Sequence, residues 1–527
     1  MNNVATSRHV HVPVQTERVT LVGVFAIILV GAIYAGYHLV DDLASVPAEA
    51  IMPYILLGIA LLIALGFEFV NGFHDTANAV ATVIYTHSLP AYIAVVWSGI
   101  FNLLGVLASS GAVAFGIISL LPVELILHVG SSAGFAMVFA LLIAAIIWNI
   151  GTWFFGIPNS SSHTLIGSII GVGLMNQMLS PSSGTAGVDW NQVYGVGRAL
   201  GFSPLIGFVL SALLLLLSKA MIRIPKLYTA PVGSAPPPWW IRGLLILTCT
   251  GVSFAHGSND GQKGMGLIML ILIGTVPTAY ALNRTIGPDQ APVFATLSTR
   301  TGDVLAKHAA AGDVKDPSAV LTDTLRTKTI QPDEMAALGA MVKTVAAQVA
   351  KFHSLSDVPA NQVGNMRNEM YLLSENIGFV KKHAADSFSA DEWNDVGAYK
   401  KAIDNGTKFI PTWVKVAVAI ALGLGTMIGW KRIVITVGEK IGKDHLTYAQ
   451  GASAEIVAMA TIGLADAYGL PVSTTHVLSS GVAGTMVANG SGLQWATIRN
   501  LIMAWVLTLP ASIIIAGALY FVFRQVF

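Results

Sequence analysis

Two short motifs with consecutive hydroxyl side chains have the residue types and the spacing that bind an anion. The segments 156–163 and 469–476 carry Gly, Pro, Ser and His at identical positions within apolar surroundings. A proline followed by hydroxyl residues is typical of a helix start, where a side-chain oxygen caps a free N–H group. Three hydroxyls in succession exceed what one cap needs, and they occur in both motifs: Ser160, Ser161, Ser162, Ser473, Thr474 and Thr475.

Helix starts of this kind offer an anion free N–H groups and the positive end of the helix dipole. Two of them meeting near the middle of a membrane would hold a tetrahedral oxyanion from both sides, so we predict that the six hydroxyl residues bind an anion of this kind. The alternative is that each motif only caps its helix. His163 and His476, which end the motifs, either hold their own loops or serve the substrate or a proton.

Two polar clusters interrupt apolar segments elsewhere in the chain. They lie at residues 71–78 and 256–263 and share Gly and Asp at matched positions. A charge in the middle of a bilayer costs at least ~2.5–3.5 kcal/mol, so such residues line a cavity or pair with one another. The clusters either hydrogen-bond neighbouring helices or, as we predict, bind a coupling ion, a proton or the substrate. The residues concerned are Asn71, Asp75, Asn78, Asn259, Asp260 and Lys263.

Further ionisable side chains in the apolar segments are candidates for a proton relay. Lys263 either pairs with Asp260 or presents its ammonium group to an anionic substrate. The metal ligands are not defined by any motif, and Asp75 and Asp260 are the candidates. The relay candidates are Glu68, His74, His163, Glu455, Asp466 and His476.

The composition places these clusters in a membrane protein. Of 527 residues, 54% are hydrophobic and only 11% are charged, whereas a soluble domain carries about 25% charged residues. Runs of apolar residues recur at the length of about 20 that a helix needs to cross a bilayer. The net charge of +1 indicates no nucleic-acid partner. The single cysteine, Cys249, excludes an intramolecular disulfide.

The apolar runs predict an all-α polytopic fold of two repeats plus one extra N-terminal helix at residues 20–40. The first set of five elements lies near residues 53–86, 90–117, 134–155, 157–178 and 199–218. The second set lies near residues 243–283, 411–430, 447–468, 470–488 and 497–523. A polar cluster interrupts the first member of each set, which predicts a broken helix there.

The resulting domains alternate between membrane segments and polar regions. Basic residues mark the cytoplasmic side of a membrane protein, and they are frequent in the linker at residues 219–242 and in residues 431–443. The charged insert at residues 284–410 is therefore expected on the periplasmic side. The two repeats are expected to be inverted, as in many secondary transporters. The predicted domains are 1–50 (polar tail and extra helix), 51–218 (first repeat), 219–242 (basic linker), 243–283 (broken helix), 284–410 (charged helical insert) and 411–527 (rest of the second repeat).

At these motifs the chain resembles the inorganic phosphate transporter (PiT) family, over nearly all the membrane part from about residue 53. The resemblance rests on Asn71–Thr86, on Ser253–Gly266, on Gly425–Lys443 and on the segments around Pro158 and Pro471. The resemblance is strongest to the low-affinity bacterial Pit group, whose members also carry a charged segment inserted after the second broken helix.

The resemblance implies symport of phosphate with a cation, which is sodium in many members and a proton in the bacterial group. In that group the substrate is a neutral complex of phosphate with a divalent metal such as Mg. By position, Asp75, Asn78 and Asp260 would serve the coupling ion and the substrate, and the two hydroxyl runs would contact phosphate.

Two residues depart from the Asn-Asp-x-x-Asn pattern of sodium-coupled members. His74 stands for the first Asn of the first copy, and Lys263 stands for the last Asn of the second. Because an ammonium group near a sodium site repels sodium, we predict coupling to protons through Asp75 or Asp260. Sodium coupling is the alternative.

Enzyme classes fit poorly. The paired aspartates lack the Gly-x-Gly-Asp sequence of intramembrane proteases, and Ser160 with His163 lacks a nucleophile elbow. A sulfate transporter, a metal transporter and a passive phosphate channel are the rival functions. We expect a multi-pass protein of the inner (plasma) membrane that uses no cofactor besides its phosphate substrate and the metal bound to it. A homodimer is left open.

Overall fold

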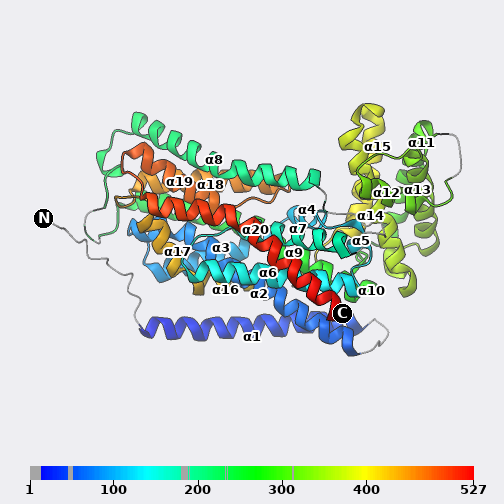
Figure 1. Ribbon diagram of the computed structural model, residues 1–527, viewed down its shortest axis with the longest axis horizontal. Coiled ribbons are helices and arrows are strands. Elements are labelled where there is room, and N and C mark those ends of the chain that lie inside the picture. Colours follow the sequence, from blue (N-terminus) through cyan, green and yellow to red (C-terminus); the bar gives the residue numbers. More distant parts are fainter. Residues whose placement is uncertain are drawn as a thin grey trace.

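The computed structural model shows an all-α protein, as predicted, and every regular element among its described residues is a helix (Figure 1). Side chains are described throughout these residues except at 14–21, 51–53, 75–78 and 191–192. The described residues are 14–44, 51–179, 188, 190–231, 233, 235–310 and 314–526.

Seven helices in the described part of the chain are long and apolar enough to cross a membrane. Large apolar side chains such as Leu62, Leu217 and Ile514 are exposed along them, as expected of surfaces that face lipid rather than water. The protein is therefore a multi-pass membrane protein, and the predicted extra N-terminal helix is present. The seven are α1 (Val14–Ala44), α2 (Ile51–Tyr85), α3 (Ala91–Ala108), α6 (Ser132–Phe154), α8 (Trp190–Met221), α16 (Thr412–Gly429) and α20 (Trp495–Val526).

Four more helices carry the polar motifs and lie among these spans. They are α7 (Ser161–Leu179), α9 (Trp239–Thr275), α18 (Tyr448–Ala467) and α19 (Thr474–Asn489). Short elements connect the long ones: α4 (Ala112–Ile118), α5 (Val123–Leu127), η1 (Pro225–Leu227), α10 (Pro277–Tyr280), α17 (Lys431–Ile435) and η5 (Thr436–Lys440).

Close helix crossings join the first half of the chain to the second. A Cβ atom at Gly425 would lie 1.9 Å from the carbonyl oxygen of Phe69, where α16 crosses α2. A Cβ atom at Gly105 would lie 2.1 Å from the carbonyl oxygen of Phe254, where α3 crosses α9. Backbones approach this closely only at glycine, which has no Cβ atom.

Glycine also permits a close approach of two backbones at two other helix crossings. A Cβ atom at Gly171 of α7 would lie 2.2 Å from the carbonyl oxygen of Ile513 on α20. One at Gly484 of α19 would lie 2.1 Å from the carbonyl oxygen of Phe208 on α8. Each half therefore packs its helices against helices of the other half, and the two halves form one membrane body.

The predicted helix breaks are not present. Helix α2 has 35 residues and α9 has 37, and both run through their polar clusters without interruption. The reason is visible in α9, where His256 and Lys263 lie four and three residues from Asp260 and face it. These side chains are paired at helical spacing, so the polar stretch needs no change of backbone.

Other element boundaries also differ from the prediction. The apolar run 90–117 divides into α3 and α4 at Gly111, whose φ of +89° interrupts the helix. Helix α8 begins at Trp190, well before the predicted residue 199, because a polar first turn continues the same helix.

The described part of residues 284–410 holds five helices and three short 3-10 turns, the first of which is η2 (Pro288–Gln290). They gather at one end of the long axis of the molecule (Figure 1). Local caps begin two of them: Asp316 accepts a hydrogen bond from the N–H of Ala319 at 3.0 Å, and Ser389 forms a capping box with Glu392. Hydrogen bonds from Ser389 lower the pKa of Glu392 to about 2. The helices are α11 (Ala291–His308), α12 (Pro317–Thr327), α13 (Glu334–Phe352), α14 (Ala360–His383) and α15 (Ala390–Thr407), with η3 (Leu355–Asp357) and η4 (Ala385–Ser387) between them.

The insert is anchored to the membrane body through α14. Arg367 donates a hydrogen bond to the carbonyl oxygen of Ile126 at 3.4 Å. Asn368 donates to the carbonyl oxygen of Leu127 at 3.2 Å. Both acceptors belong to α5, so the insert contacts the segment that follows α4.

Candidate functional site

The hydroxyl motifs form the starts of α7 and α19. Ser160 accepts a hydrogen bond from the N–H of His163 at 3.2 Å, and Ser473 accepts one from the N–H of His476 at 3.2 Å. The glycine that opens each motif has nearly the same φ, +66° and +65°. Capping therefore accounts for the first hydroxyl of each motif and leaves four buried hydroxyls for other partners: Ser161, Ser162, Thr474 and Thr475.

The two helix starts lie against each other, although 310 residues separate the groups in contact. Ser162 donates a hydrogen bond to the carbonyl oxygen of Val472 at 2.9 Å. The rings of His163 and His476 are 4.6 Å apart between centroids, and Trp505 of α20 lies 4.2 Å from His476. The structure thus brings together the two motifs that the sequence analysis paired.

A buried lysine joins the start of α7 to α9. Lys263 Nζ donates to Ser162 Oγ at 2.6 Å and lies 2.6 Å from Asp260 Oδ2. The same carboxylate oxygen accepts a hydrogen bond from Ser161 at 3.3 Å and lies 3.6 Å from His256 Nε2. Lys263 is 0% exposed and Asp260 is 1% exposed. An ammonium and a carboxylate so deeply buried stabilise one another only as a pair.

Helix α9 also contacts the second motif and α2. Asn259 donates to the carbonyl oxygen of Leu470 at 3.1 Å. On the α2 side, Asn71 donates to Glu68 at 3.4 Å. A Cβ atom at Gly264 would lie 2.4 Å from Glu68 Oε1, so Glu68 packs against α9 at Gly264, the residue after Lys263. We call this set the central cluster: Glu68, Asn71, Asn259, Asp260, Lys263 and the two hydroxyl motifs.

Buried polar atoms from three helices of the central cluster make no hydrogen bond to the described part of the chain. A buried polar group without a partner costs about 1–3 kcal/mol, and native proteins hold few of them. These atoms are therefore available to a polar ligand. They are Asn71 Oδ1 on α2, Asn259 Oδ1 on α9, and Thr474 Oγ1 and His476 Nε2 on α19.

His74 supports the loop before α7. Its Nε2 atom lies 2.8 Å from the carbonyl oxygen of Asn149, and its Nδ1 atom accepts a hydrogen bond from the N–H of Asn159 at 3.4 Å. Both ring nitrogens thus bond to the backbone, and this geometry favours a positioning role over a relay.

Glu455 occupies a separate buried position. The hydroxyls of Thr82 on α2 and Thr248 on α9 both donate to its carboxylate. These threonines, distant in sequence by 373 and 207 residues, were not singled out from the sequence. The structure links Glu455 to α2 and α9 by these hydrogen bonds.

A further polar group beside the central cluster contains the relay candidate Asp466. Asp466 of α18 accepts hydrogen bonds from Ser258 at 2.6 Å and from Gln262 at 2.7 Å. The oxygen of Gln262 accepts the N–H of Val113 at 2.9 Å. Ser258 and Gln262, the partners of Asp466, were not singled out from the sequence.

Two predicted residues lie outside the described side chains. Asp75 and Asn78 belong to α2, but the environment of their side chains is not described. Among the described residues, no three His, Cys, Asp or Glu side chains are grouped to hold a metal ion.

Comparison with known proteins agrees with this architecture. The Phosphate transporter family matches residues 71–516. The low-affinity inorganic phosphate transporter PitA of Escherichia coli (strain K12) is 42% identical over 496 residues, which cover 89% of this chain and 97% of PitA. PitB of the same strain is 40% identical over 486 residues, covering 89% of this chain and 97% of PitB.

More distant proteins are similar over the same length. A probable low-affinity inorganic phosphate transporter of Bacillus subtilis (strain 168) is 27% identical over 90% of this chain and 99% of its own. A solved structure of a sodium-dependent phosphate transporter is 17% identical, with a TM-score of 0.48, over 90% of this chain and 100% of that chain. On the match over residues 71–516 and the identity to PitA, the chain belongs to the phosphate transporter family, whose members are transporters and not enzymes.

Proposed function

We propose that this protein imports inorganic phosphate across the inner membrane as a secondary active transporter and couples this import to protons. The observation that carries the proposal is the meeting of two helix starts at one buried lysine. Lys263 donates to Ser162 of the first motif, and Ser162 donates to the carbonyl oxygen of Val472 in the second. Free N–H groups, hydroxyls and an ammonium group together match the charge and the acceptor oxygens of phosphate.

Within this site, Lys263 supplies charge and the four remaining hydroxyls supply directed donors. Ser161 and Ser162 approach from α7, and Thr474 and Thr475 approach from α19. The available atoms of Asn71 and Asn259 lie on α2 and α9. Phosphate held between these helices would be contacted from both halves of the protein, which is what alternating access around a fixed site requires.

Inverted repeats form part of the same proposal, and the glycine crossings support it. Phe69 and Phe254, which receive the close contacts on α2 and α9, precede Asp75 and Asp260 by the same number of residues. Their partners lie on α16 and α3, one from each half.

The second pair of crossings also occurs at equal sequence offsets in the two halves. Gly171 and Gly484 follow His163 and His476 by the same number of residues. Their partner helices are α20 and α8, again exchanged between the halves. A two-fold relation between the repeats produces this reciprocal packing.

Proton coupling is proposed because Lys263 places a positive charge where a sodium ion would otherwise approach Asp260. The ammonium group lies 2.6 Å from the carboxylate, so a cation entering there meets like-charge repulsion. Asp260, or Asp75 of α2, then takes the coupling proton. A neutral divalent metal–phosphate complex is the proposed form of the substrate when metal is present.

The test is labelled-phosphate uptake into proteoliposomes, with a pH gradient or a sodium gradient imposed separately, with and without magnesium. Uptake driven by inward protons supports the proposal, and dependence on magnesium supports the metal complex. Sodium-driven, metal-independent uptake would overturn the account of coupling. Competition by arsenate but not by sulfate identifies the substrate class, and accumulation against a gradient excludes a passive channel.

Matched variants of α7 test the site itself. Ser162→Ala removes the contact with Lys263. Ser168→Ala removes a buried hydroxyl whose hydrogen bond within the described part of the chain goes to the carbonyl oxygen of Thr164 in its own helix. We expect uptake to fall strongly in the first variant and to stay near wild type in the second. Equal uptake by both variants would place phosphate elsewhere.

The insert is proposed to face the periplasm, in line with the basic linker on the opposite side. Cys249, the single cysteine of the chain, is buried. In intact cells, a membrane-impermeant maleimide should therefore label Lys343→Cys in the insert. It should label Lys226→Cys in the linker only after permeabilisation. The reverse labelling pattern would show that the insert faces the cytoplasm.

A further inference from the structure

A cavity of about 280 Å³ lies where the insert meets the membrane body, and no residue of the central cluster lines it. Its wall on the insert side comes from α14, at Gly364, Arg367 and Asn368. Its wall on the membrane side comes from residues 126–131, which join α5 to α6, and from the end of α9 with the start of α10. Among the described residues that line the cavity there is no Asp and no Glu.

Arg367 carries the fixed charge of this cavity, and it is buried, with only 6% of its surface exposed. Its Nη1 atom donates to the carbonyl oxygen of Ile126 at 3.4 Å and to Asn368 Oδ1 at 3.1 Å. Both acceptors are neutral, and the Nε atom is buried without a hydrogen-bond partner in the described part of the chain. Because a buried charge is costly unless it is paired, the guanidinium group has both charge and donors left for an anion.

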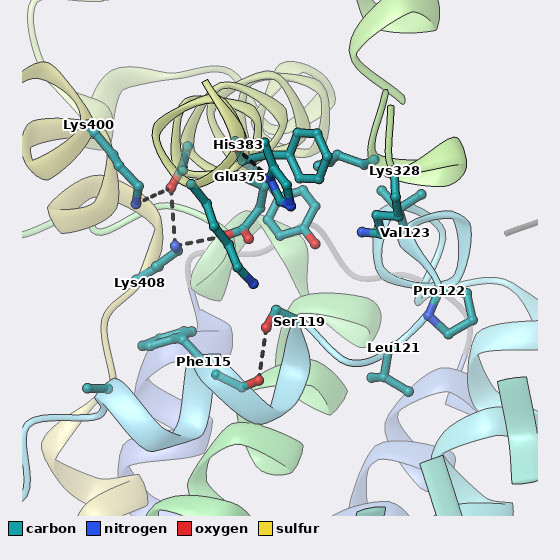
Figure 2. A pocket seen from close by; sticks show the side chains of 18 residues that line it. Phe115, Ser119, Leu121, Pro122, Val123, Lys328, Glu375, His383, Lys400 and Lys408 are labelled. Carbon is teal, nitrogen blue, oxygen red and sulfur yellow. Dashed lines mark hydrogen bonds and ion pairs between the residues drawn. The ribbon is translucent and has the colours of Figure 1, made fainter. Parts of the chain in front are cut away.

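The acidic and aromatic neighbours of Arg367 on α14 compensate this charge only in part. Glu375, two turns further along the helix, is held by Lys408 at 2.9 Å (Figure 2). The ring of Tyr371 lies 5.0 Å from the guanidinium carbon. Burial lowers the pKa of the Arg367 guanidinium more than Tyr371 and Glu375 raise it.

The start of α6 forms part of the opposite wall. Ser131 Oγ accepts the N–H of Gly134 at 3.2 Å, which leaves the two preceding N–H groups of this helix without an acceptor among the described residues. Such N–H groups and the positive end of the helix dipole attract anions. Gly130 and Ser131 line the cavity, so the positive end of α6 and the guanidinium group of Arg367 border the same space.

Glycines shape both walls of the cavity. A Cβ atom at Gly130 would lie 2.4 Å from the carbonyl oxygen of Gly274, so the link before α6 packs directly against the end of α9. A Cβ atom at Gly364, one turn before Arg367 on α14, would meet no atom within 4 Å. Open space therefore remains beside a buried guanidinium group.

We propose that this cavity binds a phosphate-type oxyanion, either the dissolved ion or the phosphate group of a lipid, between Arg367 and the start of α6. A guanidinium group matches phosphate oxygens in charge and in geometry, and helix N–H groups do so from the other wall. A tetrahedral oxyanion has acceptor oxygens for both walls. The bound anion links the insert to the membrane body, where Arg367 already contacts Ile126. This site is separate from the proposed transport site and does not depend on transport.

The test is hydrogen exchange of the purified, delipidated protein in maltoside micelles, with inorganic phosphate titrated against chloride at constant ionic strength. Exchange at the start of α6 should slow as phosphate rises, by about tenfold at about ten times the Kd, because the ligand binds only the closed state. Arg367→Gln should lose this effect. The matched control is Arg300→Gln, which removes an exposed arginine of the insert that does not line the cavity and should keep the effect.

A second variant keeps the arginine and fills the cavity, because Arg367→Gln also removes a hydrogen bond that docks the insert. Gly364→Leu places a side chain in the open space of the cavity and should abolish the effect of phosphate. Gly397→Leu on α15 also meets open space, lies outside the cavity, and should keep the effect. If Gly364→Leu retains the phosphate-dependent protection of wild type, the proposed site is wrong.

Two arms identify the source of the anion. Slower exchange with inorganic phosphate in the delipidated protein assigns the site to the dissolved ion. Slower exchange only in nanodiscs that contain phosphatidylglycerol, lost in Arg367→Gln and Gly364→Leu, assigns it to a lipid headgroup. A response to neither probe, or an equal response in all variants, would overturn the site. Protection at the starts of α7 and α19 reports the central cluster instead, so a failure of the proposed function is distinguished from a failure of this inference.

Discussion

Replacing Lys263 with methionine removes the one ammonium group of the central cluster and keeps a side chain of similar length. In the structure, Lys263 is 0% exposed and its Nζ atom lies 2.6 Å from Asp260. Loss of one partner of a buried ion pair costs about 3–5 kcal/mol, because the other charge stays buried without compensation. His256, 3.6 Å from the same oxygen, offsets part of this cost. We therefore expect Lys263→Met to lower the free energy of unfolding by about 3 kcal/mol.

The pairing itself is measured by a double-mutant cycle. In Lys263→Met/Asp260→Asn both charges are gone, and replacing a whole buried pair is often close to neutral. The double variant should therefore be more stable than Lys263→Met, with a coupling energy of at least about 2 kcal/mol between the two sites. Sites that are distant and share no partners show no coupling of this size.

The assay is unfolding of the purified protein in mixed micelles with increasing SDS, followed by tryptophan fluorescence. Lys343→Met, an exposed lysine of the insert, is the control and should change the free energy of unfolding by less than about 0.5 kcal/mol. The reasoning is refuted if Lys263→Met is as stable as wild type. It is also refuted if the effects of the two single substitutions simply add in the double variant.

Three other perturbations follow from the structure. Burial raises the pKa of the Glu334 carboxyl to about 7 from 4.5, so the folded insert holds this proton more tightly than the unfolded chain does. The stability of the insert should thus fall by up to about 3 kcal/mol as the pH rises from about 4.5 to about 7 and stay level above. Hydrogen exchange in α13 measures this slope, and Glu334→Gln should abolish it. Gly484→Val places a Cβ atom against the Phe208 carbonyl, which a Cβ atom would meet at 2.1 Å, and should destabilise the protein by about 1–3 kcal/mol or more. Gly151→Ala, with open space around it, is the control in the same SDS titration, and equal stability of the two variants would contradict the close crossing. Asp260→Asn should abolish uptake driven by a pH gradient in proteoliposomes while the protein still inserts, and undiminished uptake would remove Asp260 from the coupling site.

Local chemistry explains why the helix starts were predictable. The cap between Ser160 and His163, and its counterpart between Ser473 and His476, join residues three positions apart. Such bonds form wherever the sequence supplies the donor and the acceptor, so the residue pattern alone indicates them. The membrane class followed in the same way, since long apolar runs have one stable environment.

The expected helix breaks show where a sequence pattern is insufficient. Polar residues in an apolar run need partners, and the sequence does not say whether a backbone break or a side-chain pair provides them. In α9 the pairs form within the helix, between Asp260 and its neighbours His256 and Lys263. The polar cluster was thus located correctly, whereas the backbone at that point was not.

The amino-acid sequence alone was sufficient for the class of the protein, the two hydroxyl motifs and the polar clusters, because each depends on composition or on neighbours within a few positions. The meeting of Ser162 with Val472, the threonine partners of Glu455 and the cavity beside Arg367 required the folded chain. These contacts join residues hundreds of positions apart, and which of them form depends on how whole helices pack. Packing of that kind is a property of the complete set of side-chain shapes and glycine crossings, so no local pattern contains it.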